Sequence, residues 1–274
     1  MTFEDKKMNS LTFSDQIPFD FNTLPNEIVL RIFSHLEVSS LARCLRVNKI
    51  WQVLANDQRL WESLYVPHIF GEKEWIKYFG FVKASPIPRS IYPILESDCP
   101  FWKGKKVKET HICFLIPESV NNQTFTLKKL EKLVKLPKQG YPTKYKHIWK
   151  DIFKNYGSLS PSQSYWVLMT KDILDESKNK TYQSQQILVE SISKKTKTNY
   201  QIPYLLEVVT GLFITYVRFK ICLPSLSSTF TRCQEDISSY HLAAGGFNEN
   251  GLSVVYNDAA YKDFGVIALR KVLT

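Results

Sequence analysis

The sequence predicts an α+β protein in two parts: an N-terminal trihelical unit, and a longer domain in which helices pack on a small mixed or antiparallel sheet. Apolar residues recur with helical spacing three times in the first quarter of the 274 residues. Apolar strand-like runs then alternate with amphipathic segments, and short strands punctuated by glycine and asparagine end the chain. The expected parts are a disordered tail, the trihelical unit, a proline-rich connector and the α+β domain, at residues 1–19, 20–66, 67–104 and 105–274.

Composition and patterning predict a cytoplasmic globular protein. Hydrophobic residues make up 44% of the sequence, so a sizeable core can form. No run approaches the roughly 18 apolar residues of a membrane helix, so no transmembrane segment is expected. Residues 1–16 lack the basic and apolar regions of a secretory signal. The 5 cysteines are widely spaced, which favours free thiols in a reducing environment.

The first helix is predicted to begin at Leu24-Pro25. Proline suits the first turn because its missing N–H needs no partner there, and Glu27 complements the positive end of the helix dipole. The apolar residues that follow recur at helical spacing and form one stripe: Ile28, Val29, Ile32, Phe33 and Leu36.

Two further helices are predicted to complete this unit. Ser39 or Ser40 can cap the second helix, Asn48 can cap the third, and Leu60-Trp61 closes the unit. The side chains expected to turn inward are mostly apolar: Leu41, Cys44, Leu45, Trp51, Leu54 and Ala55. About 45 residues bury too little apolar surface to be stable alone, so the unit should keep an apolar face that a partner completes.

Residues 24–61 resemble the F-box family. The matching features are Leu-Pro-x-Glu-Ile, then Ile-Phe-x-x-Leu, then Leu-x-x-Cys-x-x-Val-Asn-x-x-Trp, and the closing Leu-Trp. Members of this family bind a Skp-type adaptor, which joins them to a cullin ubiquitin ligase. The resemblance implies that the adaptor contacts a set of mostly apolar residues: Leu24, Pro25, Ile28, Ile32, Phe33, Leu36, Leu41 and Val47. It leaves two roles open for Trp51 and Trp61, in the adaptor surface or in the internal core.

The rest of the chain is predicted to combine helices with short strands. The expected helices are 126–136, 145–156, 182–194 and 203–220, with a short helix or turn at 72–82. Residues 205–217 are apolar enough for a buried helix. The expected strands are 110–117, 164–170, 230–233, 240–244, 252–256 and 264–269, with turns at 245–246, 250–251 and 257–258. The sequence has no internal repeat, so leucine-rich, WD-type and Kelch-type recognition domains are not expected.

From about residue 70 to its end, the chain resembles a group of F-box proteins carried by chlamydia-like bacteria that live inside amoebae. The resemblance rests on motifs with no assigned chemistry: 99–108, 165–172, 229–233, 245–247 and 264–271. It implies an origin and a shared fold, and no activity. In a bacterial protein, an adaptor-binding unit makes sense mainly as a tool used in a host. The resemblance therefore implies an effector that acts in the cytosol of a eukaryotic host.

No catalytic residue, metal or cofactor is predicted. His111 and Cys113 share one face of a predicted strand, but no second pair completes a metal site. The glycines at 245, 246 and 251 lack the Lys-Ser/Thr and the following helix of a phosphate loop, so a turn is the preferred interpretation.

Cys233 and His241 could act as a thiol nucleophile and its base, with Asp236 or Asp263 to orient the base. A chain with 5 cysteines and 5 histidines supplies such a pair by chance. We therefore predict that both residues are structural.

Lysines are concentrated in one block. Residues 102–154 carry 13 lysines and 4 acidic residues, so this block holds +9 of the total net charge of +10. The block contains no arginine, the residue best suited to bidentate phosphate recognition, so nucleic acid is not the expected ligand. It is either a solvated face or a surface for an acidic protein or an anionic membrane. The candidate residues for such a surface are Lys144, Lys146, Lys150 and Lys154.

Three functions are compatible with these patterns. The chain can be an F-box adaptor that presents a target protein for ubiquitination, an F-box protein that brings a thiol hydrolase or transferase to the ligase, or a decoy that occupies the adaptor. The first is preferred because the sequence displays no converging polar cluster in the second part. No motif identifies the target protein.

Overall fold

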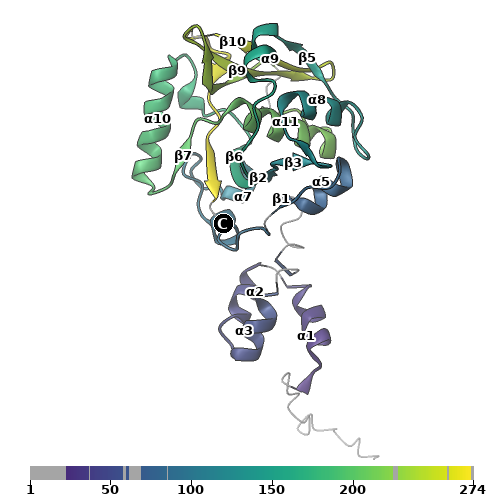
Figure 1. The fold of residues 1–274 in the computed structure, drawn as a ribbon. Helices are drawn as coiled ribbons and strands as arrows, with labels where there is room; N and C mark the ends of the chain where they lie inside the picture. The colour runs from purple at the N-terminus through teal and green to yellow at the C-terminus, as the bar shows by residue number, and fades with distance from the viewer. Residues whose placement is uncertain are drawn as a thin grey trace, which may run out of the picture. The chain divides into compact units, whose positions relative to one another are not determined.

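The structure, a computed structural model, describes residues 23–36, 38–57, 60–61, 69–84, 86–224, 228–257 and 259–272. Contacts divide the chain into two compact units, Met1–Val66 and Pro67–Thr274. Helices and mixed sheets confirm the predicted α+β class (Figure 1). The predicted tail at 1–19 lies outside the described residues. Within the described ranges, no helix combines the length and the apolar character that a membrane crossing requires.

The described part of the first unit contains three short helices: α1 (Asn26–Phe33), α2 (Val38–Cys44) and α3 (Lys49–Ala55). The predicted cap at Asn48 is confirmed, because its Oδ1 accepts the backbone N–H of Trp51 at 2.8 Å. The predicted serine cap is wrong, because α2 begins at Val38, ahead of both Ser39 and Ser40.

Two five-stranded mixed sheets frame the second unit. The first has the order β1 (Ile69–Phe70), β2 (His111–Ile116), β6 (Tyr165–Thr170), β12 (Leu269–Val272) and β7 (Tyr200–Gln201). The second has the order β11 (Phe264–Gly265), β8 (Phe230–Ile237), β9 (Tyr240–Asn248), β10 (Gly251–Tyr256) and β5 (Tyr145–Ile148). The pairs β1–β2, β11–β8 and β10–β5 are parallel, and the other pairs in these sheets are antiparallel.

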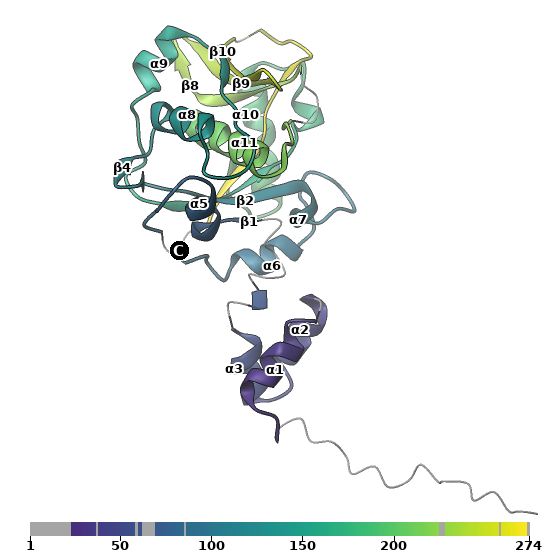
Figure 2. The same ribbon diagram turned by 90° about the vertical axis from the view of Figure 1, so that its right-hand side faces the viewer.

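Helix α11 (Leu205–Phe219) lies between the two sheets in both views of the fold (Figures 1 and 2). Its Gly211 faces Phe114 and Met169 of the first sheet so closely that a Cβ atom would collide with both side chains. Its Phe213 ring meets Phe247 of the second sheet, with ring centroids 5.7 Å apart. A helix covered on both sides should be mostly apolar, and the structure confirms the buried helix that the sequence predicts at 205–217.

The other helices surround this framework. They are α5 (Glu72–Tyr78), α6 (Ile91–Glu96), α7 (Val107–Thr110), α8 (Leu127–Lys135), α9 (Lys150–Tyr156) and α10 (Tyr182–Lys195), with a 3-10 turn η3 (Asp175–Ser177) and a hairpin of β3 (Ser119–Val120) and β4 (Gln123–Thr124). The structure confirms three predicted helices and two predicted strands, with ends that differ by at most two residues: the helices at 126–136, 182–194 and 203–220 and the strands at 110–117 and 164–170. Helix α8 is capped by the Thr126 hydroxyl and buries one stripe of leucine side chains.

Two element predictions are wrong because neighbouring chain segments override the local pattern. The predicted helix at 145–156 is a strand and a helix, since β5 pairs with β10 and Lys144 accepts the N–H of Leu252 at 3.0 Å. Trp149, which precedes α9, is 40% exposed, whereas Ile152 is buried. The predicted strand at 264–269 is divided between β11 and β12, which belong to different sheets.

The predicted turn at Gly245-Gly246 is also wrong, because both glycines lie inside β9. Gly245 pairs with Phe230 of β8, and a Cβ atom there would collide with the carbonyl of Thr229 and with Phe230. These glycines allow close approach of a neighbouring strand instead of a reversal. The turn at Asn250-Gly251 is confirmed by the β9–β10 hairpin, in which Gly251 pairs with Asn248. In the predicted turn at 257–258, residue 258 lies outside the described ranges.

Candidate functional site

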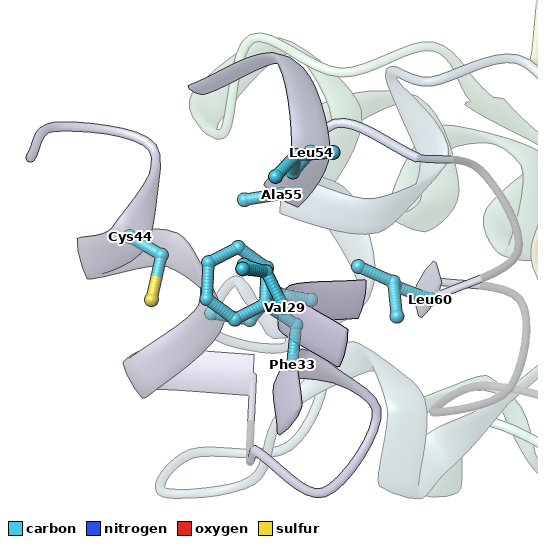
Figure 3. Close-up of a cluster of buried hydrophobic side chains, with 7 residues drawn as sticks. Val29, Phe33, Cys44, Leu54, Ala55 and Leu60 are labelled. Atoms are coloured by element: carbon cyan, nitrogen blue, oxygen red, sulfur yellow. The ribbon is translucent and has the colours of Figure 1, made fainter. Parts of the chain in front are cut away.

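A hydrophobic core joins α1, α2 and α3 of the first unit (Figure 3). Its buried members are Val29, Phe33, Leu41, Cys44, Leu54, Ala55 and Leu60. Helical spacing brings them together, because Val29 and Phe33 are four residues apart and Leu41 and Cys44 are three apart. Each short helix therefore packs its core-facing apolar residues into this cluster.

Among the described residues of this unit, five large aliphatic side chains are exposed. We call them the aliphatic surface: Ile28, Ile32, Val47, Ile50 and Val53. One turn separates the two isoleucines of α1, and one turn separates Ile50 from Val53 on α3, so each helix presents a two-residue apolar stripe. Exposed fractions run from 38% at Ile32 to 71% at Val53. Single exposed apolar residues are ordinary, but five among the described residues of so small a unit indicate a surface suited to a protein partner.

The residues predicted to face an adaptor fall into three groups. Those in the aliphatic surface are Ile28, Ile32 and Val47, and Pro25 is also exposed. Those partly buried against the core are Leu24 and Leu36. Those inside the core are Phe33 and Leu41, which are 2% and 0% exposed. The last two shape the helices beneath the surface, so a partner that leaves this core intact would not touch them directly.

The two tryptophans with open roles both contribute to the internal packing. Trp61 donates its indole N–H to the carbonyl of Ala55 at 2.7 Å, which fixes the end of α3. Trp51 packs edge-on against Phe33, with ring centroids 5.2 Å apart. Both remain partly exposed.

Sequence reasoning missed Ile50 and Val53. The signal was present, because α3 already supplies Leu54 and Ala55 to the core. Two further apolar residues on another side of a seven-residue helix exceed what that core can use. Surplus apolar residues on a short amphipathic helix are the pattern to search for.

The four lysines predicted to form an anionic-partner patch are exposed on the second unit. Lys144 directly precedes β5, an edge strand of the second sheet, and Lys146 lies within that strand. Lys150 and Lys154 lie on α9. None of the ion pairs found in the described part of the chain includes them. Trp149, between the two pairs, lies with its ring centroid 4.5 Å from that of Tyr256.

The side chains of Cys233 and His241, the candidate nucleophile and base, are packed against other residues of the fold. The Cys233 side chain is fully buried, and burial raises the pKa of its thiol well above the ordinary value, which disfavours a nucleophilic thiolate. The His241 ring stacks on Tyr182 with centroids 3.4 Å apart. Neighbouring Arg232 is buried too, and its guanidinium donates to the carbonyls of Lys180 and Asn257, so this stretch holds the fold together.

The His111–Cys113 pair is enclosed in the first sheet. His111 lies between the Thr110 hydroxyl at 2.9 Å and the Tyr200 hydroxyl at 3.1 Å, and burial lowers its pKa to about 3. Cys113 is buried, which raises the pKa of its thiol. Among the residues that the structure describes, no cluster of three or more His, Cys, Asp or Glu side chains could hold a metal ion.

Comparison with known proteins places a family on the first unit. Residues 21–67 match the F-box-like family, so the chain carries an F-box-like domain at its N-terminus. The similar proteins include human F-box/WD repeat-containing protein 8, which is 37% identical over 60 residues, covering 22% of this chain and 10% of that protein. The same protein of the rat is 35% identical over 69 residues, covering 23% of this chain and 12% of the rat protein.

A third relative is from Talaromyces stipitatus and is described as a probable E3 ubiquitin ligase complex SCF subunit, sconB. It is 37% identical over 68 residues, covering 24% of this chain and 10% of that protein. This chain therefore spans about a tenth of the length of these relatives. No solved structure matches the chain significantly.

Proposed function

We propose that the chain is an F-box adaptor: its first unit binds a Skp-type subunit of a cullin ubiquitin ligase, and its second unit presents a target protein for ubiquitination. The observation that carries the proposal is the aliphatic surface on a unit that matches the F-box-like family. The unit already has its own core, so these exposed side chains are available to a partner. Covering them would bury apolar area and stabilise a small unit that buries little surface alone.

The test is direct binding of the full chain to a purified Skp-type adaptor, measured by isothermal titration calorimetry. Saturable 1:1 binding with a negative heat-capacity change is expected, because the contact buries apolar surface. Absence of binding by folded protein would refute the adaptor assignment.

For the second unit we propose binding without catalysis. The buried, high-pKa thiol of Cys233 and the stacked ring of His241 support this. The lysine patch supports an anionic partner, because its four cations are exposed and lack ion pairs with the described residues. Reversing Lys144, Lys146, Lys150 and Lys154 to Glu should weaken target capture and flatten its salt dependence. Capture that ignores both salt and these changes would make the patch a solvated face.

The resemblance of the region after about residue 70 to F-box proteins of amoeba-associated bacteria supports a finer proposal. The chain would act as a bacterial effector in the cytosol of a eukaryotic host. The test is expression of the chain in amoebae, followed by recovery of the host adaptor and a search for the chain bound to it. Absence of the chain from the host ligase would contradict the proposal.

A further inference from the structure

A cavity of about 410 Å³ opens at the N-terminal end of α11 in the second unit. Its walls are the 159–163 loop before β6, the first turn of α11, Glu235 of β8 and the end of β12 at Lys271 and Val272. The volume falls within the range of small-molecule sites, which is roughly 300–1,000 Å³. Leucine side chains and tyrosine rings supply much of the lining, and a few polar groups converge on it, as such sites require.

The cavity wall already holds one cation. The Lys271 ammonium lies 3.2 Å from Glu207 Oε1, 4.9 Å from the centre of the Tyr165 ring and 5.1 Å from that of Tyr204. The Tyr165 hydroxyl donates to the same carboxylate oxygen at 2.8 Å. A carboxylate between aromatic faces is the arrangement that recognises an ammonium group.

A second carboxylate in the cavity, that of Glu235, has no cation among the described residues. Both oxygens of Glu235 accept the backbone N–H of Leu205, at 3.0 and 2.9 Å, and none of the ion pairs found among the described residues includes Glu235. Burial, with a smaller contribution from the charge of Glu207, raises the pKa of Glu235 to about 7. The helix dipole of α11 offsets part of this cost, but Lys271 is paired with Glu207, and no ion pair found among the described residues neutralises Glu235. An incoming cation would balance the charge.

We propose that this cavity binds a primary ammonium group on an aliphatic stem, with the ammonium paired to Glu235 and the stem against Leu127, Leu159 and Leu206. A lysine side chain of a partner protein and a free alkylamine both carry this chemistry. The site goes beyond the adaptor proposal and does not depend on it, because it uses only residues of the second unit.

Binding should strengthen as the pH rises from 6 to 8, because Glu235 loses its proton in that range and the cation prefers the carboxylate. The other titratable or charged groups around Glu235 come from α9, β6, α10, β12, its own strand, and α11 with the residue before it: Tyr156, Tyr165, Tyr182, Lys271, Cys233, Asp236, Glu207 and Tyr204. The pKa values of Tyr156, Tyr165, Tyr182 and Cys233 are raised, so these four stay neutral throughout that range.

The full chain is titrated with Nα-acetyl-lysine methylamide and with n-butylamine, and binding is followed by NMR shifts of backbone amides. Nα-acetyl-norleucine methylamide, which lacks the ammonium group, is the neutral control and should bind at least about tenfold more weakly. Glu235→Gln keeps an acceptor for the Leu205 N–H and removes the charge, so it should weaken amine binding by at least about tenfold and abolish its pH dependence. Glu118→Gln alters an exposed carboxylate outside the cavity and should change nothing.

The two amines separate the sources of the ligand. Binding of the lysine derivative alone supports a partner's side chain, binding of n-butylamine alone supports a small amine, and binding of both supports the shared chemistry. Should Glu235→Gln lower the melting temperature, Tyr204→Leu provides a second test at a 42% exposed position and should also weaken binding. Failure of both amines to saturate, or equal binding by wild type and a folded Glu235→Gln variant, would overturn the proposal.

Discussion

Val53→Glu is the sharpest perturbation of the proposed adaptor surface. Val53 is the most exposed member of the aliphatic surface, at 71%, and makes no contribution to the core of the first unit. A glutamate at this position can remain hydrated in the free protein, so the unit should fold as before. In a complex that covers the surface, the same carboxylate would be buried against apolar side chains without a cation.

The size of the effect follows from the exposed fraction. Full burial of a valine side chain is worth about 1.5–3 kcal/mol, so covering the 71% that is exposed contributes about 1–2 kcal/mol. Desolvation of the new carboxylate adds at least about 1–3 kcal/mol, the cost of an unpaired polar group, because a charged group costs more. The sum corresponds to a loss of affinity for the Skp-type adaptor of about 30-fold or more.

The assay is calorimetric titration of the full chain with the Skp-type adaptor, with hydrogen exchange of α1 to α3 as the check on folding. Gln52→Glu is the matched control, because it adds the same charge at an exposed position of α3 about 100° from Val53 and about 200° from Ile50 around the helix. The control should retain its affinity within about twofold. Unchanged affinity in both Val53→Glu and Ile28→Glu, with folding intact, would refute the aliphatic surface as the adaptor site.

Three further predictions concern the interior. Phe33→Ala, at a 2% exposed core position, should cost about 3–5 kcal/mol and abolish exchange protection of α1 to α3, and retained protection would contradict the assigned core. Cys233→Ser should destabilise the second unit by about 1–2 kcal/mol, and a thiol-directed activity probe should not label Cys233 at neutral pH; selective labelling that His241→Ala suppresses would promote the thiol-enzyme alternative. His111 has a pKa of about 3 when folded and about 6.5 when unfolded, so the unfolded chain binds its proton first and stability falls by up to about 1.4 kcal/mol per pH unit on acidification between those values. Glu235, whose pKa is about 7, changes the stability in the opposite direction between about pH 7 and 4.5. The measurement is therefore the difference in the free energy of unfolding between wild type and His111→Phe, taken from denaturant melts, and this difference should change with pH. A constant difference would contradict the buried neutral histidine.

Local patterns were sufficient for much of the first unit. The Asn48 cap and the inward stripe of Leu41, Cys44, Leu54 and Ala55 follow from side-chain chemistry and helical spacing. Which apolar residues remain exposed did not follow as easily. Phe33 and Leu41 share the apolar character of Ile28 and Ile32, and only the packing of three helices assigns the first pair to the core and the second pair to solvent.

In the second unit, the sequence by itself determined the segments whose pattern is strong and locally consistent. The capped helix α8, the apolar strand β2 and the mostly apolar helix α11 are of this kind, because burial selects their residues one by one. Tertiary structure alone decided that the larger strands divide into two five-stranded sheets, that residues 145–148 form an edge strand, and that Gly245 and Gly246 lie inside β9. Each of these depends on hydrogen bonds or close contacts with segments distant in the chain, so no local propensity encodes it. The amine cavity is of the same origin, since Glu207, Glu235 and Lys271 converge only when β8, α11 and β12 are packed together.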